Sequence, residues 1–136
     1  MKALFSLALV CATAFAADEN DRMGNLPDAP EFNTATYSGY LTVTSTKRLH
    51  YVFVESETDP VNDPVVVWFN GGPGCSSMLA FMQENGPLAI DDGESFIKRN
   101  PYPWNKRANM IWLESPAGVG WSVGELKSDL SHNDMS

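Results

Sequence analysis

The chain has 136 residues, of which 43% are hydrophobic and 19% are charged. This balance is ordinary for a globular domain and gives no reason to expect disorder, and the length suits one domain with a modest core. The formal net charge of −8 would repel a phosphate backbone, so we expect no nucleic-acid partner.

The first residues predict a secretory signal peptide. A short positive start is followed by an almost unbroken apolar or small stretch at residues 3–17, and Ala14 and Ala16 are small residues at the two positions that a signal peptidase reads. A membrane anchor would need roughly 18 or more apolar residues. We therefore expect residues 1–16 to be removed and the mature chain to lie outside membranes.

The two cysteines differ in position. Cys11 lies in the predicted signal, which leaves Cys75 alone in the mature chain. A lone cysteine in an oxidising compartment has either a partner elsewhere or a free thiol, and the residues alone do not decide between these.

The next segments predict an arm followed by a strand pair. Residues 17–36 are polar and contain two prolines, which is typical of an extended arm. Residues 37–43 and 49–54 are rich in β-branched and aromatic side chains and are joined by residues 44–48. This pattern predicts two antiparallel strands, and the proline-rich and acidic residues 55–64 then form a connection.

A different kind of strand comes next. Residues 64–69 are continuously apolar, as expected for a central strand that is covered on both faces. The strand leads directly into the glycine-rich residues 70–74. Ser76 or Ser77 could then cap a short helix over residues 78–84.

A second buried strand is predicted at residues 108–113, followed by a proline- and glycine-rich loop at residues 115–120. Antiparallel strands followed by strand–loop–helix units indicate an α/β sheet. The chain ends in a polar stretch at residues 127–136, with nothing after it to cover the second strand, so we expect the sheet to be incomplete.

The glycine-rich loop at residues 70–74 is the first candidate site. It follows the end of a predicted buried strand, which is where open α/β sheets bind ligands. Glycines let the backbone approach a substrate closely and turn successive N–H groups to one side, which suits an oxyanion or a carboxylate. A tight turn without a ligand explains the local residues equally well.

Four motifs together resemble the serine carboxypeptidase family. They are WFNGGPGCSS at residues 68–77, ENGP at 84–87, NPYPWNK at 100–106 and ESPAGVGWS at 114–122. The resemblance implies the α/β-hydrolase fold, with residues 37–136 as its N-terminal portion: an antiparallel strand pair leading into a mostly parallel sheet. It implies no cofactor, and a location outside the cell or in a lysosome or vacuole.

The resemblance also implies roles for residues of two motifs. Gly72 would donate one oxyanion-hole N–H, while Asn70 and the Gly71 N–H would hold the substrate's C-terminal carboxylate. Glu84 would join them as a carboxylic acid, positioned with help from Trp68. A charged Glu84 would repel the substrate carboxylate whereas a protonated one donates a hydrogen bond, so acidic operation follows. Without the motif, Glu84 would be interpreted as a solvated residue near a helix end.

The remaining family positions are structural. Cys75 matches a family cysteine that forms a disulfide with one much further along, and that partner is absent here. Residues 114–122 are expected to shape a loop near the site, without a catalytic role.

The family's nucleophile lies in a GESYAG elbow, and Ser95 is the only tempting match. Ile97 stands where the elbow needs glycine, and the match precedes the motif at residues 100–106 whereas the family's nucleophile follows it. We therefore reject Ser95 as the nucleophile.

Neither histidine fits the catalytic triad. The triad order in α/β-hydrolases is Ser, Asp, His, whereas His50 lies in a predicted strand and His132 in the polar tail, where it is interpreted as a solvated surface residue. No residues have metal-ligand spacing and no phosphate loop is present, so we expect no metal.

The sequence thus predicts the front portion of a serine-type carboxypeptidase that acts on peptides with a free C-terminus. The Ser-Asp-His triad would lie beyond Ser136, so this chain itself should be inactive. Two alternatives stay open: an acyltransferase that uses the same triad, and a short non-catalytic protein that binds peptide C-termini.

Overall fold

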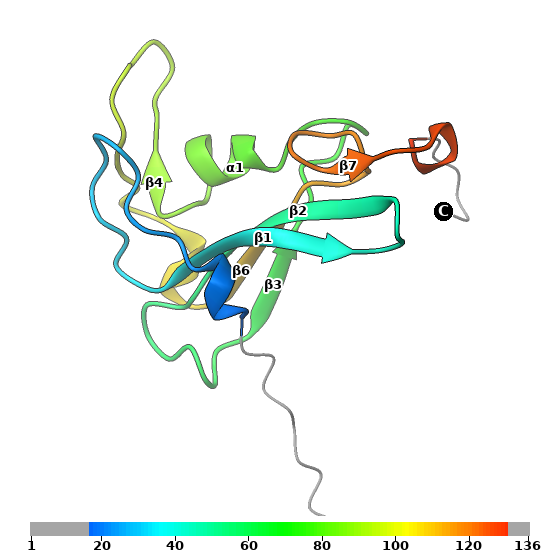
Figure 1. Ribbon diagram of the computed structural model, residues 1–136. Coiled ribbons are helices and arrows are strands. Elements are labelled where there is room, and N and C mark those ends of the chain that lie inside the picture. Colours follow the sequence, from blue (N-terminus) through cyan, green and yellow to red (C-terminus); the bar gives the residue numbers. More distant parts are fainter. Residues whose placement is uncertain (1–16, 131–136) are drawn as a thin grey trace, which may run out of the picture.

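A mixed β-sheet with one short helix on one of its faces forms the body of the molecule. The computed structural model describes residues 17–130 (Figure 1), so the predicted signal peptide and His132 lie outside the described residues. Within them the main sheet has the order β1-β2-β6-β3, and β7 pairs with β2. The elements are η1 (Glu19–Asp21), β1 (Thr36–Thr42), β2 (Lys47–Val54), β3 (Val65–Trp68), α1 (Met78–Gln83), β4 (Leu88–Ala89), β5 (Lys98–Arg99), η2 (Trp104–Lys106), β6 (Asn109–Leu113), β7 (Val123–Gly124) and η3 (Lys127–Asp129).

Strands β1 and β2 form the predicted antiparallel pair. Their register runs from Thr36 opposite Val54 to Thr42 opposite Arg48. The connection is tighter than predicted, because the Val43 N–H donates to the Lys47 carbonyl at 2.9 Å and so starts the second strand two residues early. The predicted pair is confirmed with a shorter turn.

Strands β3 and β6 are parallel, with Val65 opposite Asn109 and Trp68 opposite Trp112. Parallel neighbours need a crossover connection, and here that connection contains α1. Since β6 also pairs with β2 in the antiparallel sense, the hairpin leads into the parallel pair. This arrangement confirms the predicted α/β class.

The core lies between the sheet and α1. Met110 and Trp112 on β6 are fully buried, and the Phe81 ring of α1 meets the Trp112 indole edge-on, with ring centres 5.1 Å apart. Burial of such aromatic and sulfur-containing side chains is the main stabilising contribution in a core of this size. The buried cluster comprises Val52, Val54, Ala80, Phe81, Ala108, Met110 and Trp112.

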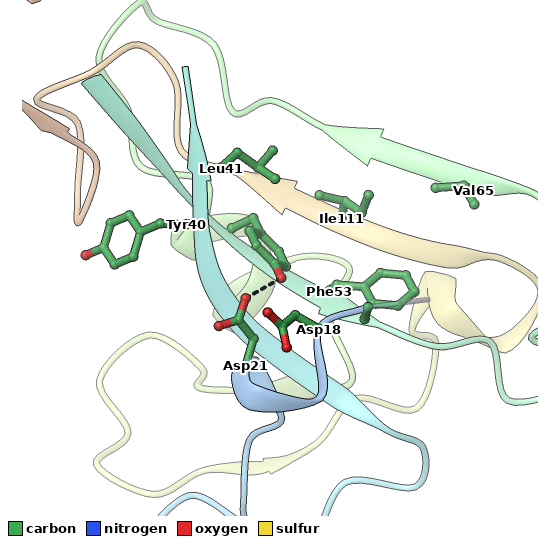
Figure 2. Close-up of a pocket in the computed structure, with 9 residues that line it drawn as sticks. Asp18, Asp21, Tyr40, Leu41, Phe53, Val65 and Ile111 are labelled. Carbon is green, nitrogen blue, oxygen red and sulfur yellow. Dashed lines mark hydrogen bonds between the residues drawn. The ribbon is translucent and has the colours of Figure 1, made fainter. Parts of the chain in front are cut away.

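The opposite face of the sheet is open, which makes one prediction wrong. Residues 64–69 were expected to be covered on both faces, yet Val65 is 62% and Val67 is 44% exposed. Strand β3 is at the edge of the described sheet, and α1 covers only the face that carries Val66 and Trp68. Figure 2 shows Val65 beside Ile111 on the open face, along a shallow pocket of about 380 Å³.

The N-terminal arm is tied to the same region of the sheet. It was expected to be extended, and it contains one short turn, η1, at whose start the Asp18 carboxylate accepts the Asn20 N–H at 2.9 Å. The Tyr51 hydroxyl of β2 donates to the Asp21 carboxylate at 2.7 Å (Figure 2). Burial, and this hydrogen bond next, raise the pKa of Tyr51 well above its usual range.

Helix α1 is confirmed, and of the two serines that could cap it only Ser76 makes a hydrogen bond to its first turn. Ser77 precedes the helix and makes no capping bond, whereas the Ser76 hydroxyl accepts the Met78 N–H at 3.2 Å. The Ser77 hydroxyl instead accepts the Asn70 N–H and donates to the Leu113 carbonyl. Across residues 17–130, none of the helices has the length and apolar character that a membrane crossing requires.

Candidate functional site

The loop between β3 and α1 has a backbone that requires glycine. Gly71, Gly72 and Gly74 have φ angles of 77°, 118° and 106°, a region that residues with a side chain rarely adopt. At Gly72 a Cβ would also lie 3.2 Å from both the backbone nitrogen and the sulfur of Cys75. The three glycines predicted to shape this loop therefore do so for a steric reason.

Two hydrogen bonds close the loop on itself. The Cys75 N–H donates to the Gly71 carbonyl at 3.2 Å, and the Asn70 N–H donates to the Ser77 hydroxyl at 3.2 Å. Ser77 in turn donates to the Leu113 carbonyl at the end of β6, at 2.7 Å. The loop is therefore fixed at its start and its end by the same buried serine.

The structure brings Trp68 and Asn70 together. The indole N–H of Trp68 donates to the Asn70 side-chain oxygen at 3.3 Å, which orients the amide with its oxygen toward the indole. Within residues 17–130, the Asn70 amide nitrogen has no hydrogen-bond acceptor, so its two N–H groups can donate to a ligand. The edge of the Trp68 ring also meets the Trp104 ring, with centres 5.3 Å apart.

Glu84 lies at the C-terminal end of α1 and is exposed. In the described part of the chain its carboxylate makes no hydrogen bond to Asn70 or Trp68, so the structure does not join all the predicted site residues directly. Trp104 connects Trp68 to the end of α1. Its ring contacts the Trp68 ring, and its backbone N–H donates to the Asn85 carbonyl at 3.0 Å. The motif that contains Glu84 thus lies next to the motif at residues 100–106.

Asn85 and Asn100 hold this end of the helix, although the sequence predicted no role for either. The Asn85 side-chain oxygen accepts the indole N–H of the buried Trp112 at 2.9 Å. The Asn100 amide donates to the carbonyls of Glu84 and Gly86 at 3.2 and 2.9 Å. Asn-Gly and Asn-Pro pairs indicate turns in a sequence, but nothing local identifies the carbonyls that their amides bind.

Comparison with known proteins identifies the family. A sequence model of the serine carboxypeptidase family, Peptidase S10, matches residues 27–136. The chain belongs to this family.

Curated relatives agree with the family assignment. The mouse (Mus musculus) lysosomal protective protein is 48% identical over 110 residues, which are 81% of this chain and 23% of that protein. Serine carboxypeptidase ctsa-3.1 of Caenorhabditis elegans is 40% identical over 124 residues, or 89% of this chain and 22% of that protein. The chain therefore spans about a quarter of the length of the curated relatives it matches.

A solved structure agrees at the level of the fold. Kex1(delta)p, a prohormone-processing carboxypeptidase from Saccharomyces cerevisiae, superposes with a TM-score of 0.65 at 21% sequence identity, covering 87% of this chain and 28% of that one. The partial α/β-hydrolase fold expected from the sequence is confirmed.

In this member of the serine carboxypeptidase family, the motif at residues 114–122 does more than form a loop. Glu114 directly follows β6, is fully buried, and accepts the Trp121 N–H at 2.7 Å and the Ser76 hydroxyl. The oxygen that accepts the Trp121 N–H also lies 3.0 Å from Nδ1 of His50. The loop at residues 114–122 was expected to be structural, and its acid indeed ties it to the glycine-rich loop.

The other candidates lie apart from the loop or have no partner within the described residues. Cys75 is exposed and is a free thiol within residues 17–130, so its disulfide stays a prediction. Ser95 is exposed between β4 and β5, and His50 is buried in β2 as the strand prediction required. In the described part of the chain, no group of three or more His, Cys, Asp or Glu residues is placed to hold a metal ion.

Proposed function

We propose that the complete protein is a serine-type carboxypeptidase that removes C-terminal residues from peptides at acidic pH, and that this chain is its front portion. In this proposal the loop at residues 70–74 binds the substrate carboxylate and the oxyanion. The catalytic serine, aspartate and histidine belong to residues after Ser136. The protein enters the secretory pathway and acts outside the cell or in a lysosome or vacuole.

The observation that carries the proposal is the conformation of the glycine-rich loop. Its positive φ angles require glycine and its serine anchor holds it at the end of a parallel strand, where α/β proteins bind ligands. Backbone N–H groups fixed in this way stabilise an oxyanion without reorganisation, which suits the role of Gly72. The Asn70 amide, held through its oxygen by Trp68, would donate to the carboxylate beside the Gly71 N–H.

Glu84 is the basis for acidic operation. Its exposed position at the end of α1 is open to a substrate, and a carboxylic acid there can donate to the substrate carboxylate only while it is protonated. A Glu84 carboxylate would instead place two negative charges together. We therefore expect substrate binding to weaken as the pH rises.

The test is to sequence the transcript past Ser136 and to assay its full product on blocked dipeptides at acidic pH. An in-frame GESYAG elbow followed by Asp and His, and release of the C-terminal residue, are expected. Transfer of the acyl group to an added alcohol in preference to water would instead favour an acyltransferase. A stop codon after Ser136 would rule out carboxypeptidase activity for this product and would leave binding of peptide C-termini as the remaining alternative.

A matched pair of glycine variants tests the loop itself. Gly72→Ala should lower kcat of the full product by about a hundredfold or more, because it disturbs an oxyanion donor. Gly93→Ala is the control, since Gly93 has a φ of 81° but open space around its Cα. An equal fall in kcat in the two variants would mean that the loss reflects strain at a positive φ in general and not an oxyanion-hole role of Gly72.

A further inference from the structure

A second cluster of reactive side chains lies on the sheet face that α1 covers, and its acid, Glu114, joins it to the end of the glycine-rich loop through Ser76. The Ser38 hydroxyl oxygen of β1 lies 2.9 Å from Nε2 of His50 on β2. Nδ1 of the same ring lies 3.0 Å from the Glu114 carboxylate. A serine hydroxyl, an imidazole and a buried acid therefore form one continuous row, which is the arrangement of an activated nucleophile with an oriented base.

The other contacts of Glu114 fix the direction of the protons. The Ser76 hydroxyl and the Trp121 N–H both donate to its carboxylate, so it acts as the acceptor in the row. His50 must then donate through Nδ1, which leaves Nε2 of the neutral ring as an acceptor. The Ser38 hydroxyl consequently donates to Nε2, as a nucleophile that passes its proton to a base would.

The imidazole cannot easily turn away from this arrangement. The His50 N–H donates to the Ser122 hydroxyl at 2.8 Å, and that hydroxyl donates to the Glu114 carbonyl at 2.6 Å. The Tyr40 ring lies edge-on to the imidazole, with centres 5.5 Å apart, and its hydroxyl donates to the Trp121 carbonyl at 3.1 Å. Backbone and ring contacts thus hold the base against the serine.

Ser38 and His50 also face an open groove. Together they line a groove of about 610 Å³, and Ser38 is half-buried, so a small molecule can reach its hydroxyl. The walls are largely apolar, with Met78, Phe81 and Met82 among the lining residues. Methionine side chains are flexible and adapt to irregular apolar groups, so the groove suits an ester with an apolar acyl chain.

We propose that Ser38, His50 and Glu114 form a nucleophilic serine site that takes an acyl group from apolar esters. The Ser38 oxygen forms a bond to the ester carbonyl carbon while its proton passes to Nε2 of His50. The carbon–oxygen bond to the alcohol then breaks, and the alcohol leaves with the proton from His50. The product is an ester on Ser38, and Glu114 acts as a positioning residue that holds the imidazole.

This site is independent of the proposed carboxypeptidase function. The peptidase nucleophile is expected after Ser136, whereas Ser38 lies on β1 within this chain. Labelling of Ser38 in the 136-residue chain would therefore stand whether or not the full product cleaves peptides.

The first experiment treats the 136-residue chain with an alkyl fluorophosphonate and locates the adduct by mass spectrometry. The Ser38 oxygen bonds to phosphorus, fluoride leaves, and the proton goes to His50, so no other reactant is needed. We expect labelling at Ser38, its loss in Ser38→Ala, and a fall of about a hundredfold in rate in His50→Gln. Ser95→Ala is the control, because Ser95 is exposed and its loss should leave labelling unchanged.

A second variant keeps the test decisive if a substitution of His50 disturbs the fold. In Ser38→Cys the new thiol should be alkylated by iodoacetamide about tenfold or more faster than Cys75, because an adjacent imidazole favours the thiolate. Cys75 is exposed in the same molecule and serves as the internal reference. Equal rates at the two cysteines would contradict the proposal.

The role of Glu114 has its own spectroscopic readout. Ring ¹⁵N shifts should show His50 protonated at Nδ1 in the unchanged chain, and Glu114→Gln should alter that tautomer and slow phosphonylation. An imidazole protonated at Nε2, or no adduct on Ser38 in the unchanged chain, would overturn the proposal.

Discussion

The Ser77 hydroxyl donates a hydrogen bond to the Leu113 carbonyl at 2.7 Å. The two residues are 36 positions apart, yet they meet because β3 and β6 are parallel and end at the same edge of the sheet. Ser77 also accepts the Asn70 N–H at 3.2 Å and is 1% exposed. One buried hydroxyl therefore fixes the glycine-rich loop to the strand end that leads to Glu114.

Replacement of this hydroxyl should destabilise the chain. Ser77→Ala leaves the Leu113 carbonyl and the Asn70 N–H without this partner, and we expect the free energy of unfolding to fall by about 1–3 kcal/mol. Urea unfolding followed by tryptophan fluorescence measures the change. Ser95→Ala, at an exposed position, should change stability by less than about 0.5 kcal/mol. Equal stability of the two variants would mean that the loop is held by other contacts.

Removal of the Trp112 indole N–H should also destabilise the chain, in this case within the core. Trp112→Phe leaves the Asn85 side-chain oxygen without its 2.9 Å partner and also opens space beside Phe81, so we expect a loss of about 2–4 kcal/mol. Thermal unfolding monitored by circular dichroism measures it. Trp121→Phe is the control, because that ring is 68% exposed. A larger effect at Trp121 would contradict this account of the core.

The strands could be predicted from the sequence because their evidence is local. Alternation and β-branched side chains located β1 and β2 to within two residues, and the apolar run over residues 108–113 located β6. The exposure of Val65 could not be predicted. An apolar run indicates that a strand favours burial, but it does not indicate whether another element packs on each face of that strand. The short strands β4, β5 and β7 were missed since two residues carry no period.

Only part of the candidate site could be predicted from the sequence, because some of its contacts are local and others join distant residues. Glycine and proline reveal a special backbone within a few residues, so the loop at residues 70–74 was identified. The row from Ser38 through His50 to Glu114 joins residues 12 and 64 positions apart. Nothing local in the sequence indicates that pairing, since it depends on the register of β1, β2 and β6.

Asp63 should make the stability of the connection before β3 depend on pH. Hydrogen bonds from Ser56, at 2.5 Å, and then from Thr58 hold the pKa of Asp63 below its usual range. Because the pKa is lower in the folded chain than in the unfolded chain, the contribution is present above the unfolded value and is lost as the pH falls through the folded value.

The corresponding variant is Asp63→Asn. We expect it to be less stable than the unchanged chain at neutral pH, and the difference between them to shrink on acidification, as measured by urea unfolding at several pH values. Asp92→Asn, at an exposed position, is the control and should leave the pH dependence as it is. A difference that stays constant with pH would mean that the Asp63 charge has no part in the contribution.

Glu84→Gln should separate the proposed acid requirement of substrate binding from catalysis in the full product. At acidic pH, glutamine and protonated glutamic acid can both donate a hydrogen bond to the substrate carboxylate, so KM should be similar. At higher pH a carboxylate at position 84 repels the substrate carboxylate, whereas glutamine does not. The KM of the unchanged enzyme should therefore rise by about tenfold relative to the variant, an energy of about 1.4 kcal/mol. Glu125→Gln is the matched control, since Glu125 is also exposed. If the KM values of the unchanged enzyme and Glu84→Gln rise together, Glu84 does not contact the substrate carboxylate, and the proposed acidic operation would need another origin.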